Sequence, residues 1–99
     1  MIKYRVMDLL KEAIENSAII PRVQKIVLKV ICSSSYPISA KEIEDILGLS
    51  RPSVSFSLKM LLKRNFISRS KDNVYLYSPN QERMKEIRER FVSKSSNIK

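Results

Sequence analysis

The sequence of 99 residues contains no histidine and a single cysteine, Cys32. Within one chain this excludes a zinc site built from several imidazoles or thiolates. It also excludes the nucleophile–histidine pairs of many hydrolases. Glu42, Glu44 and Asp45 stand close together, but carboxylates on a short exposed helix are usually solvated. We therefore expect no enzyme, no metal and no cofactor.

Glycine and long apolar runs are also scarce. Gly48 is the only glycine, and a sole glycine favours a backbone position that needs a positive φ, as at the end of a helix. No apolar run approaches the roughly 18–20 residues of a transmembrane helix. Charged residues interrupt the apolar positions of the N-terminus, unlike those of a signal peptide. We expect a cytoplasmic protein without a membrane partner.

Acidic residues are missing between Asp45 and Asp72, although the chain as a whole has a net charge of +9. This span contains only basic charges, on Arg51, Lys59, Lys63, Arg64, Arg69 and Lys71. Such a run is either a solvated face or a strip that binds a polyanion. Charge alone leaves both interpretations open.

Apolar residues recur at helical spacing along most of the chain. Because the segment 21–34 is apolar on most sides, we expect it to be the buried centre of the fold. Cys32 lies at the edge of its apolar arc and is expected to be a small buried hydrophobe. A redox switch or an intersubunit disulfide is the alternative. The other expected elements are a helix over 2–17, a helix over about 50–65, a β-hairpin over about 66–78, a helix over 79–93 and a frayed tail over 94–99.

Capping residues predict a helix, a tight turn and a second helix. Ser39 stands three residues before Glu42, which is a capping box. Gly48 ends this short helix, and Ser50 caps the next one. The serines that follow alternate as in a strand, but LKMLLKR favours a helix. Asn65 is well placed to end that helix in a left-handed conformation.

In this order of elements the sequence resembles the winged helix-turn-helix DNA-binding proteins, over about residues 21–78. The resemblance rests on ISAKEIEDILGLSRPSVSFSLKMLLKRNFISR and on the basic wing tip RSKDN. It is closest to the small MarR/ArsR-like transcriptional regulators of prokaryotes and their viruses. If the protein is viral, the expected location is the cytoplasm of the host. The sequence departs from the family at Asn65, where glycine is usual, and at Phe56 and Ser57, where Arg or His is often found.

The resemblance implies a mainly α fold with a small β-hairpin (α+β), a single winged-helix domain flanked by N- and C-terminal dimerisation helices. It also implies that the recognition helix enters the major groove, where short hydroxyls allow close approach to phosphates. The residues implied in DNA binding are Ser50, Arg51, Pro52, Ser53, Ser55, Phe56, Lys59, Lys63, Arg69, Lys71 and Asn73. For Phe56 the alternative is packing with Met60 against the wing or a terminal helix.

The terminal helices carry apolar stripes that a minimal winged domain does not need. Relatives commonly form a two-fold dimer through such helices, which matches two half-sites on DNA. The alternative is that both helices fold back on their own domain. The residues expected at the dimer interface are Val6, Leu9, Leu10, Ile14, Met84, Ile87 and Phe91.

The function implied is that of a sequence-specific regulator of transcription. We expect a repressor that binds double-stranded DNA as a homodimer, at a palindromic operator. The alternatives are a non-specific architectural DNA-binding protein and a winged helix that contacts another protein, against which the acid-free span argues. Many relatives bind a small-molecule effector, but nothing in the sequence marks a site for one.

Overall fold

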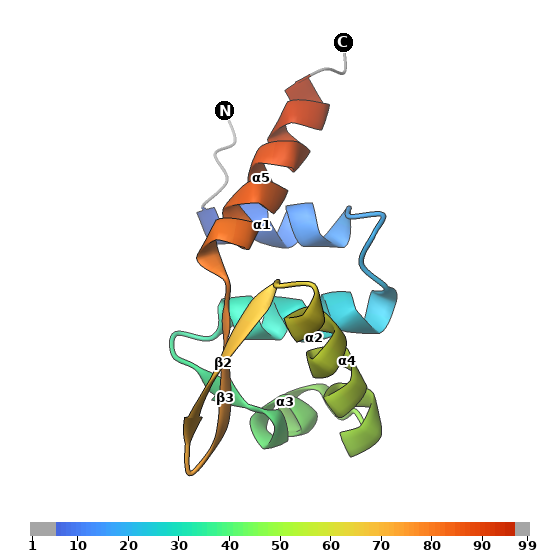
Figure 1. The fold of residues 1–99 in the computed structure, drawn as a ribbon. Coiled ribbons are helices and arrows are strands. Elements are labelled where there is room, and N and C mark those ends of the chain that lie inside the picture. The colour runs from blue at the N-terminus through green and yellow to red at the C-terminus, as the bar shows by residue number, and fades with distance from the viewer. Residues whose placement is uncertain (1–5, 97–99) are drawn as a thin grey trace.

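The computed structural model describes residues 6–96, and the side chains of residues 9–94. Five helices and a small sheet make up a mainly α fold (Figure 1). The molecule is elongated, with extents of 49 × 23 × 23 Å. Along the chain the elements are α1 (Val6–Glu15), α2 (Arg22–Ser33), β1 (Ile38–Ser39), α3 (Ala40–Leu47), α4 (Arg51–Lys63), β2 (Ile67–Asp72), β3 (Val74–Pro79) and α5 (Gln81–Ser96).

The expected hairpin is part of a three-stranded antiparallel sheet in the order β1-β3-β2. The additional strand is β1, which pairs Ile38 with Tyr77 and Ser39 with Leu76. A strand of two residues carries no periodicity, which is why the sequence does not reveal it. We call the hairpin of β2 and β3 the wing. By pairing with β3, β1 connects the wing to the start of α3.

Helix α2 is the buried centre of the fold, as predicted. Val27, Leu28 and Ile31 are at most 1% exposed, and α2 contacts α1, α3, α4 and β3. Cys32 follows these residues near the C-terminal end of α2 and is also buried. Its Sγ is 3.6 Å from Sδ of Met84 in α5. Burial raises the pKa of the Cys32 thiol to about 12, as expected for a small buried hydrophobe.

The predicted caps of the helix-turn-helix are confirmed. The hydroxyl of Ser39 accepts a hydrogen bond from Glu42 N at 3.2 Å, and the Glu42 carboxylate accepts one from Ser39 N at 3.0 Å. Gly48 ends α3 with φ 67°. Asn65 follows α4 with φ 62°, which agrees with its predicted left-handed conformation.

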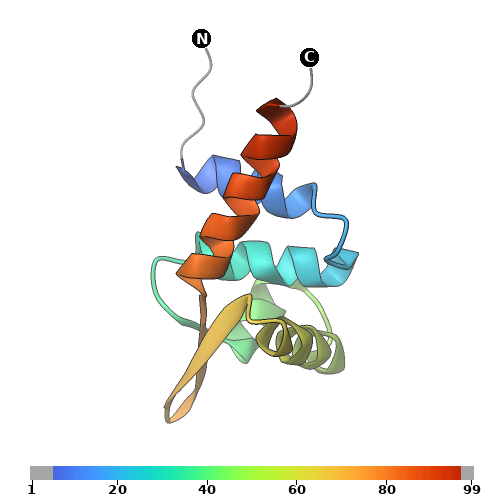
Figure 2. The ribbon, with the colours of Figure 1, turned by 45° about the horizontal axis from the view of Figure 1, so that its top comes forward.

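The terminal helices pack on one another at the end of the molecule opposite the wing (Figure 2). The prediction of a frayed tail from residue 94 is wrong as far as Ser96, because α5 continues to that residue. Residues 97–99 lie outside the described part of the chain, as do residues 2–5 of the predicted first helix. Among residues 6–96, none of the helices combines the length and the hydropathy needed to span a bilayer.

A junction below α5 connects α4, the wing and α5. Phe66 is fully buried there, and its carbonyl accepts a hydrogen bond from Asn80 N at 3.0 Å. The Asn80 side chain donates to Asn65 O at 3.0 Å and accepts from Glu82 N at 3.2 Å. Both ends of the wing and the start of α5 are thereby held together.

We expect Gly48→Ala to lower the free energy of unfolding by about 1 kcal/mol, as measured by urea denaturation. Nothing lies within 4 Å of a Cβ built on Gly48, so the cost is the positive φ of 67° alone. The complementary change Asn65→Gly should leave stability nearly unchanged, because the small strain of asparagine that it removes is offset by the extra freedom that glycine gives the unfolded chain. A Gly48→Ala variant with the same free energy of unfolding as the wild-type protein would contradict this expectation.

We expect the Cys32 thiol to resist labelling by a disulfide reagent at pH 8 in the folded protein. Burial raises its pKa to about 12, and the thiolate, not the thiol, is the nucleophile. In urea the same thiol should react at the rate of a free cysteine. Rapid stoichiometric labelling of the folded protein would show that the thiol is accessible and would favour the redox alternative.

Candidate nucleic-acid interface

The second helix of the helix-turn-helix begins at a well-defined cap. Ser50 is its N-cap residue and accepts a hydrogen bond from Ser53 N at 3.3 Å. Pro52 lies in the first turn, where its missing N–H costs little. Ser57 is 2% exposed and faces the core, whereas Ser55 is exposed. The clustered serines therefore have different positions: one caps the helix, one packs inside and the others lie toward the surface.

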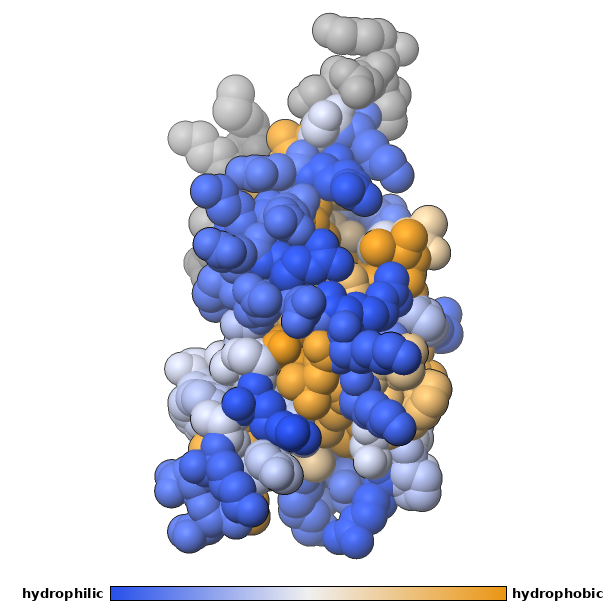
Figure 3. All heavy atoms as spheres, viewed as in Figure 1, coloured by the Kyte–Doolittle hydropathy of each residue, from blue (hydrophilic) through white to orange (hydrophobic). Residues whose placement is uncertain are grey.

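A groove lies between α3, α4 and the wing, with a volume of about 1070 Å³. Its floor is apolar: Leu58 is 3% exposed and Tyr77 is 7% exposed. Figure 3 shows apolar side chains in this area between hydrophilic side chains. We call this surface the wing groove. It is lined by Ser39, Ala40, Lys41, Glu44, Arg51, Ser55, Leu58, Lys59, Leu62, Lys63, Arg69, Val74, Tyr75 and Tyr77.

Positive charge dominates the wing groove. Its basic residues come from three elements: Lys41 from α3, Arg69 from the wing, and Arg51, Lys59 and Lys63 from α4. Glu44 is the one acidic residue in the lining. Lys41 is paired with Asp45 at 3.3 Å, and both side chains are largely exposed. A concave surface with this balance of charge attracts polyanions.

Helix α4 also presents a ridge that points away from the core, formed by Pro52, Phe56, Lys59 and Lys63. All four residues are exposed, and Phe56 is exposed to 60%. The alternative in which Phe56 packs against the wing or a terminal helix is therefore wrong. A large apolar side chain on an otherwise polar ridge is suited to contact with an apolar group of a partner.

The structure brings five of the eleven residues expected at the DNA into the wing groove: Arg51, Ser55, Lys59, Lys63 and Arg69. Pro52 and Phe56 lie on the ridge beside it. Ser50 and Ser53 are joined by the capping hydrogen bond at the start of α4. Lys71 is exposed near the end of β2, and Asn73 forms the turn of the wing with φ 67°.

Lys41 and Tyr75 also line the wing groove, although no pattern in the sequence singles them out. Lys41 reaches the groove because α3 lies beside α4. Tyr75 lies on the same face of the hairpin as Lys71, its cross-strand partner. The alternation of side chains along β3 places Tyr75 on one face of the hairpin. Which residues of β2 share that face depends on the register, which the sequence alone does not give.

Several residues expected at a dimer interface are buried within the single chain. Leu10 is 4% exposed, and Ile14 and Met84 are fully buried. The expectation that these three residues face a partner is corrected, because they fill the chain's own core. Leu9, Ile87 and Phe91 are only partly buried. Val6 lies in α1, and its side chain is outside the described part.

A surface hollow on the terminal helices contains one of these partly buried residues. Leu9 of α1 lies there together with Lys85, Arg88, Glu89, Val92 and Ser93 of α5. Val92 is 44% exposed. The hollow is thus an apolar contact surface bordered by charges, at the end of the molecule away from the wing groove.

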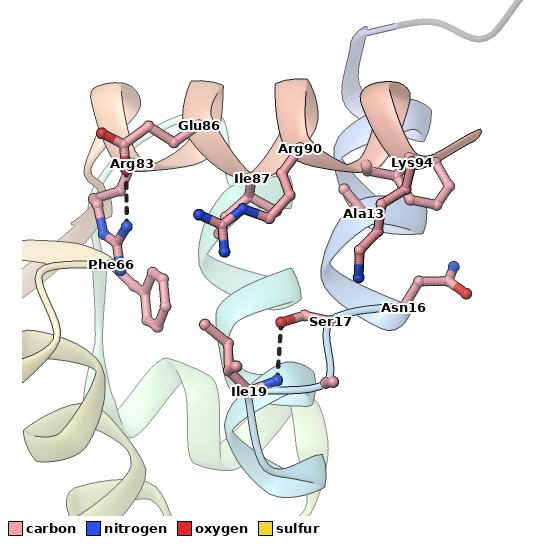
Figure 4. Close-up of a pocket in the computed structure, with 12 residues that line it drawn as sticks. Ala13, Asn16, Ser17, Ile19, Phe66, Arg83, Glu86, Ile87, Arg90 and Lys94 are labelled. Carbon is pink, nitrogen blue, oxygen red and sulfur yellow. Dashed lines mark hydrogen bonds and ion pairs between the residues drawn. The ribbon is translucent and has the colours of Figure 1, made fainter. Parts of the chain in front are cut away.

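A smaller pocket of about 120 Å³ lies between α5, the end of α1 and the loop that follows it (Figure 4). Ile19, Phe66 and Ile87 supply apolar surface, while Arg90 and Lys94 extend over the opening. Its lining also includes Glu86, which is paired with Arg83 at 2.8 Å. Since the lining comes from three separate segments, no local motif in the sequence marks it. Among residues 9–94, no three metal-ligating side chains gather at one place.

Residues 27–74 match the model of the MarR family. A search of curated proteins gives no match.

Solved structures with the same fold include ST1889 from Sulfolobus tokodaii, at 23% identity and a TM-score of 0.59 over 90% of this chain and 89% of that one. A protein of unknown function from Listeria innocua has 24% identity and a TM-score of 0.60 over 95% and 71%. The transcriptional regulator Tm0710 from Thermotoga maritima has 22% identity and a TM-score of 0.58 over 92% and 69%.

At these identities the structural likeness concerns the fold. The family match covers the centre of the fold, the helix-turn-helix and most of the wing. Residues 27–74 thus form a winged helix-turn-helix that is similar to those of the MarR family.

Proposed function

We propose that this chain is a regulator of transcription that binds specific sites on double-stranded DNA as a homodimer. Helix α4 enters the major groove, and the basic wing lies on the adjacent backbone or in the minor groove. The observation that carries the proposal is the wing groove, where five basic residues face one acidic residue beside the helix-turn-helix. Neutralising phosphates with such residues releases counterions and supplies most of the affinity for DNA.

The ridge of α4 supports a role in reading sequence. Side chains that distinguish bases must project from the helix into the major groove. Phe56 projects with 60% of its surface exposed, and its ring suits the methyl group of thymine. Arg51 lies at the start of the same helix, where it can donate to a guanine edge or to a phosphate. An architectural protein needs no such ridge, since it binds through backbone and deformability alone.

The hollow formed by α1 and α5 supports a homodimer. Leu9 and Val92 leave apolar surface exposed there, bordered by Lys85, Arg88 and Glu89, which can pair across a two-fold axis. A two-fold dimer presents two copies of α4 to successive turns of DNA, about 34 Å apart. The site of such a dimer is a palindrome.

Binding to a genomic fragment library, in competition with random duplex DNA at low and near-physiological salt, tests the function. We expect one palindromic fragment to remain bound under both challenges. Lys59→Ala should weaken binding to all duplexes and reduce the slope of log K against log salt by about one, because one phosphate contact is lost. Arg51→Ala should also lower the preference for the selected fragment.

Lys11→Ala is the matched control, because it removes the same charge from an exposed side chain that lines neither the wing groove nor the hollow of the terminal helices. If Lys11→Ala weakened binding as much as Lys59→Ala, the effect would come from net charge alone. Uniform binding that collapses with salt would favour the architectural alternative. No binding at low salt would favour a protein partner.

Sedimentation equilibrium tests the dimer. We expect Val92→Glu to shift the wild-type dimer toward the monomer, since it buries an unpaired charge next to its own symmetry mate. Ile46→Glu is the control, because Ile46 is 61% exposed on α3 and does not line the hollow of α1 and α5. An unchanged mass for Val92→Glu, or a monomeric wild-type protein, would contradict the proposed interface.

A further inference from the structure

The two faces of the wing differ in charge. In the antiparallel pairing of β2 and β3, Arg69 is opposite Tyr77 and Lys71 is opposite Tyr75. Directly opposed residues share a face of the sheet, so both basic residues and both tyrosines lie on one face. Tyr77 is 7% exposed, which identifies this face as the inner one, toward α4. Asp72 falls on the other face, since strand residues alternate.

Tyr75 contacts both basic residues of the inner face. The Arg69 guanidinium carbon lies 4.1 Å from the centre of the Tyr75 ring, and the Lys71 Nζ lies 5.1 Å from it. Both distances are within the range of cation–π attraction. Tyr75 itself is 44% exposed, so its packing in the core does not explain why it lies there.

The positive charges of Arg69 and Lys71 are not neutralised by an ion pair within the described part of the chain. The ion pairs among these residues are Lys29–Glu15, Lys41–Asp45 and Arg83–Glu86, none of which involves the wing. A guanidinium stacked on a ring keeps its N–H edges free to donate. The aromatic contact therefore fixes the position of both basic residues and leaves their hydrogen-bonding capacity for a ligand.

Lys59 and Lys63 of α4 line the same groove as Arg69. A chain of phosphates lying in the wing groove would meet basic residues from α4 on one side and from the wing on the other. Such contacts position DNA without reading its sequence.

We propose that Tyr75 is a positioning residue that holds Arg69 and Lys71 as a phosphate clamp on the inner face of the wing. Arg69 lines the wing groove together with Lys59 and Lys63, and Lys71 lies two residues nearer the wing tip. This inference rests on the proposed function and makes it more specific: α4 reads bases, while the wing holds the backbone and reads none.

The test compares Tyr75→Leu and Tyr75→Phe in binding to two duplexes of equal length, the selected library fragment and a random sequence. We expect Tyr75→Leu to weaken binding about three- to tenfold on both duplexes, because two basic side chains lose their fixed position. Tyr75→Phe keeps the ring and should stay within about twofold of wild type. Tyr36→Leu, on a loop tyrosine that is 67% exposed, should have no effect.

A second measurement separates positioning from a general structural role. In a chain that already carries Arg69→Ala and Lys71→Ala, Tyr75→Leu should cost no further affinity, because it acts only through those two residues. Thermal unfolding monitored by circular dichroism verifies that each variant is folded.

Four outcomes would overturn the clamp alone while wild-type binding stays intact. They are normal affinity of Tyr75→Leu, a loss for Tyr75→Phe as large as for Tyr75→Leu, a loss that persists without Arg69 and Lys71, and a loss confined to the selected fragment. The last would show that the wing reads bases. A wild-type protein that binds neither duplex would overturn the proposed function, and the clamp with it.

Discussion

The burial of one broad face of α2 is the constraint on which the rest of the structure depends. Val27, Leu28 and Ile31 are at most 1% exposed, and α1, α3, α4 and β3 pack against the helix. Burying each such side chain contributes about 1.5–3 kcal/mol. The helix-turn-helix and the terminal helices therefore share one core and cannot move independently without exposing it.

This shared core divides the surface of an elongated molecule into two ends. One end carries the wing groove and the ridge of α4, and the other carries the hollow between α1 and α5. The junction at Phe66 lies between them: Arg64 and Arg83 stack over its ring at 5.1 Å and 4.6 Å. Because Asn80 also bonds both Phe66 and Asn65, the start of α5 is held at a fixed place relative to the end of α4.

Local interactions made much of the fold predictable from the sequence. The capping box at Ser39, the positive φ of Gly48 and the left-handed Asn65 each depend on a few neighbouring residues, and the structure has all three. The apolar stripes of α1 and α5 were less informative. A stripe that packs on its own core has the same spacing as one that packs on a partner, which is why Leu10, Ile14 and Met84 were assigned to the dimer interface.

Prediction of the candidate site was limited for a related reason. Arg51, Lys59 and Lys63 were found because they follow one helix with a known period. Tyr75 was missed because its place beside Arg69 and Lys71 depends on the register of the hairpin, and register is set by the turn and by packing on the core. The pocket below α5 depends on contacts between distant segments, which no local pattern records.

The left-handed positions of the described residues also bear on the entropy of the unfolded chain. Three residues there have a positive φ, and only Gly48 is a glycine, while Asn65 and Asn73 occupy the other two. Asparagine tolerates this conformation at a small cost in the native state. In return the unfolded ensemble contains fewer backbone states, because glycine is the residue that loses most freedom on folding. With one glycine in 99 residues, the chain gives up less disorder when it folds than a glycine-rich domain of equal length.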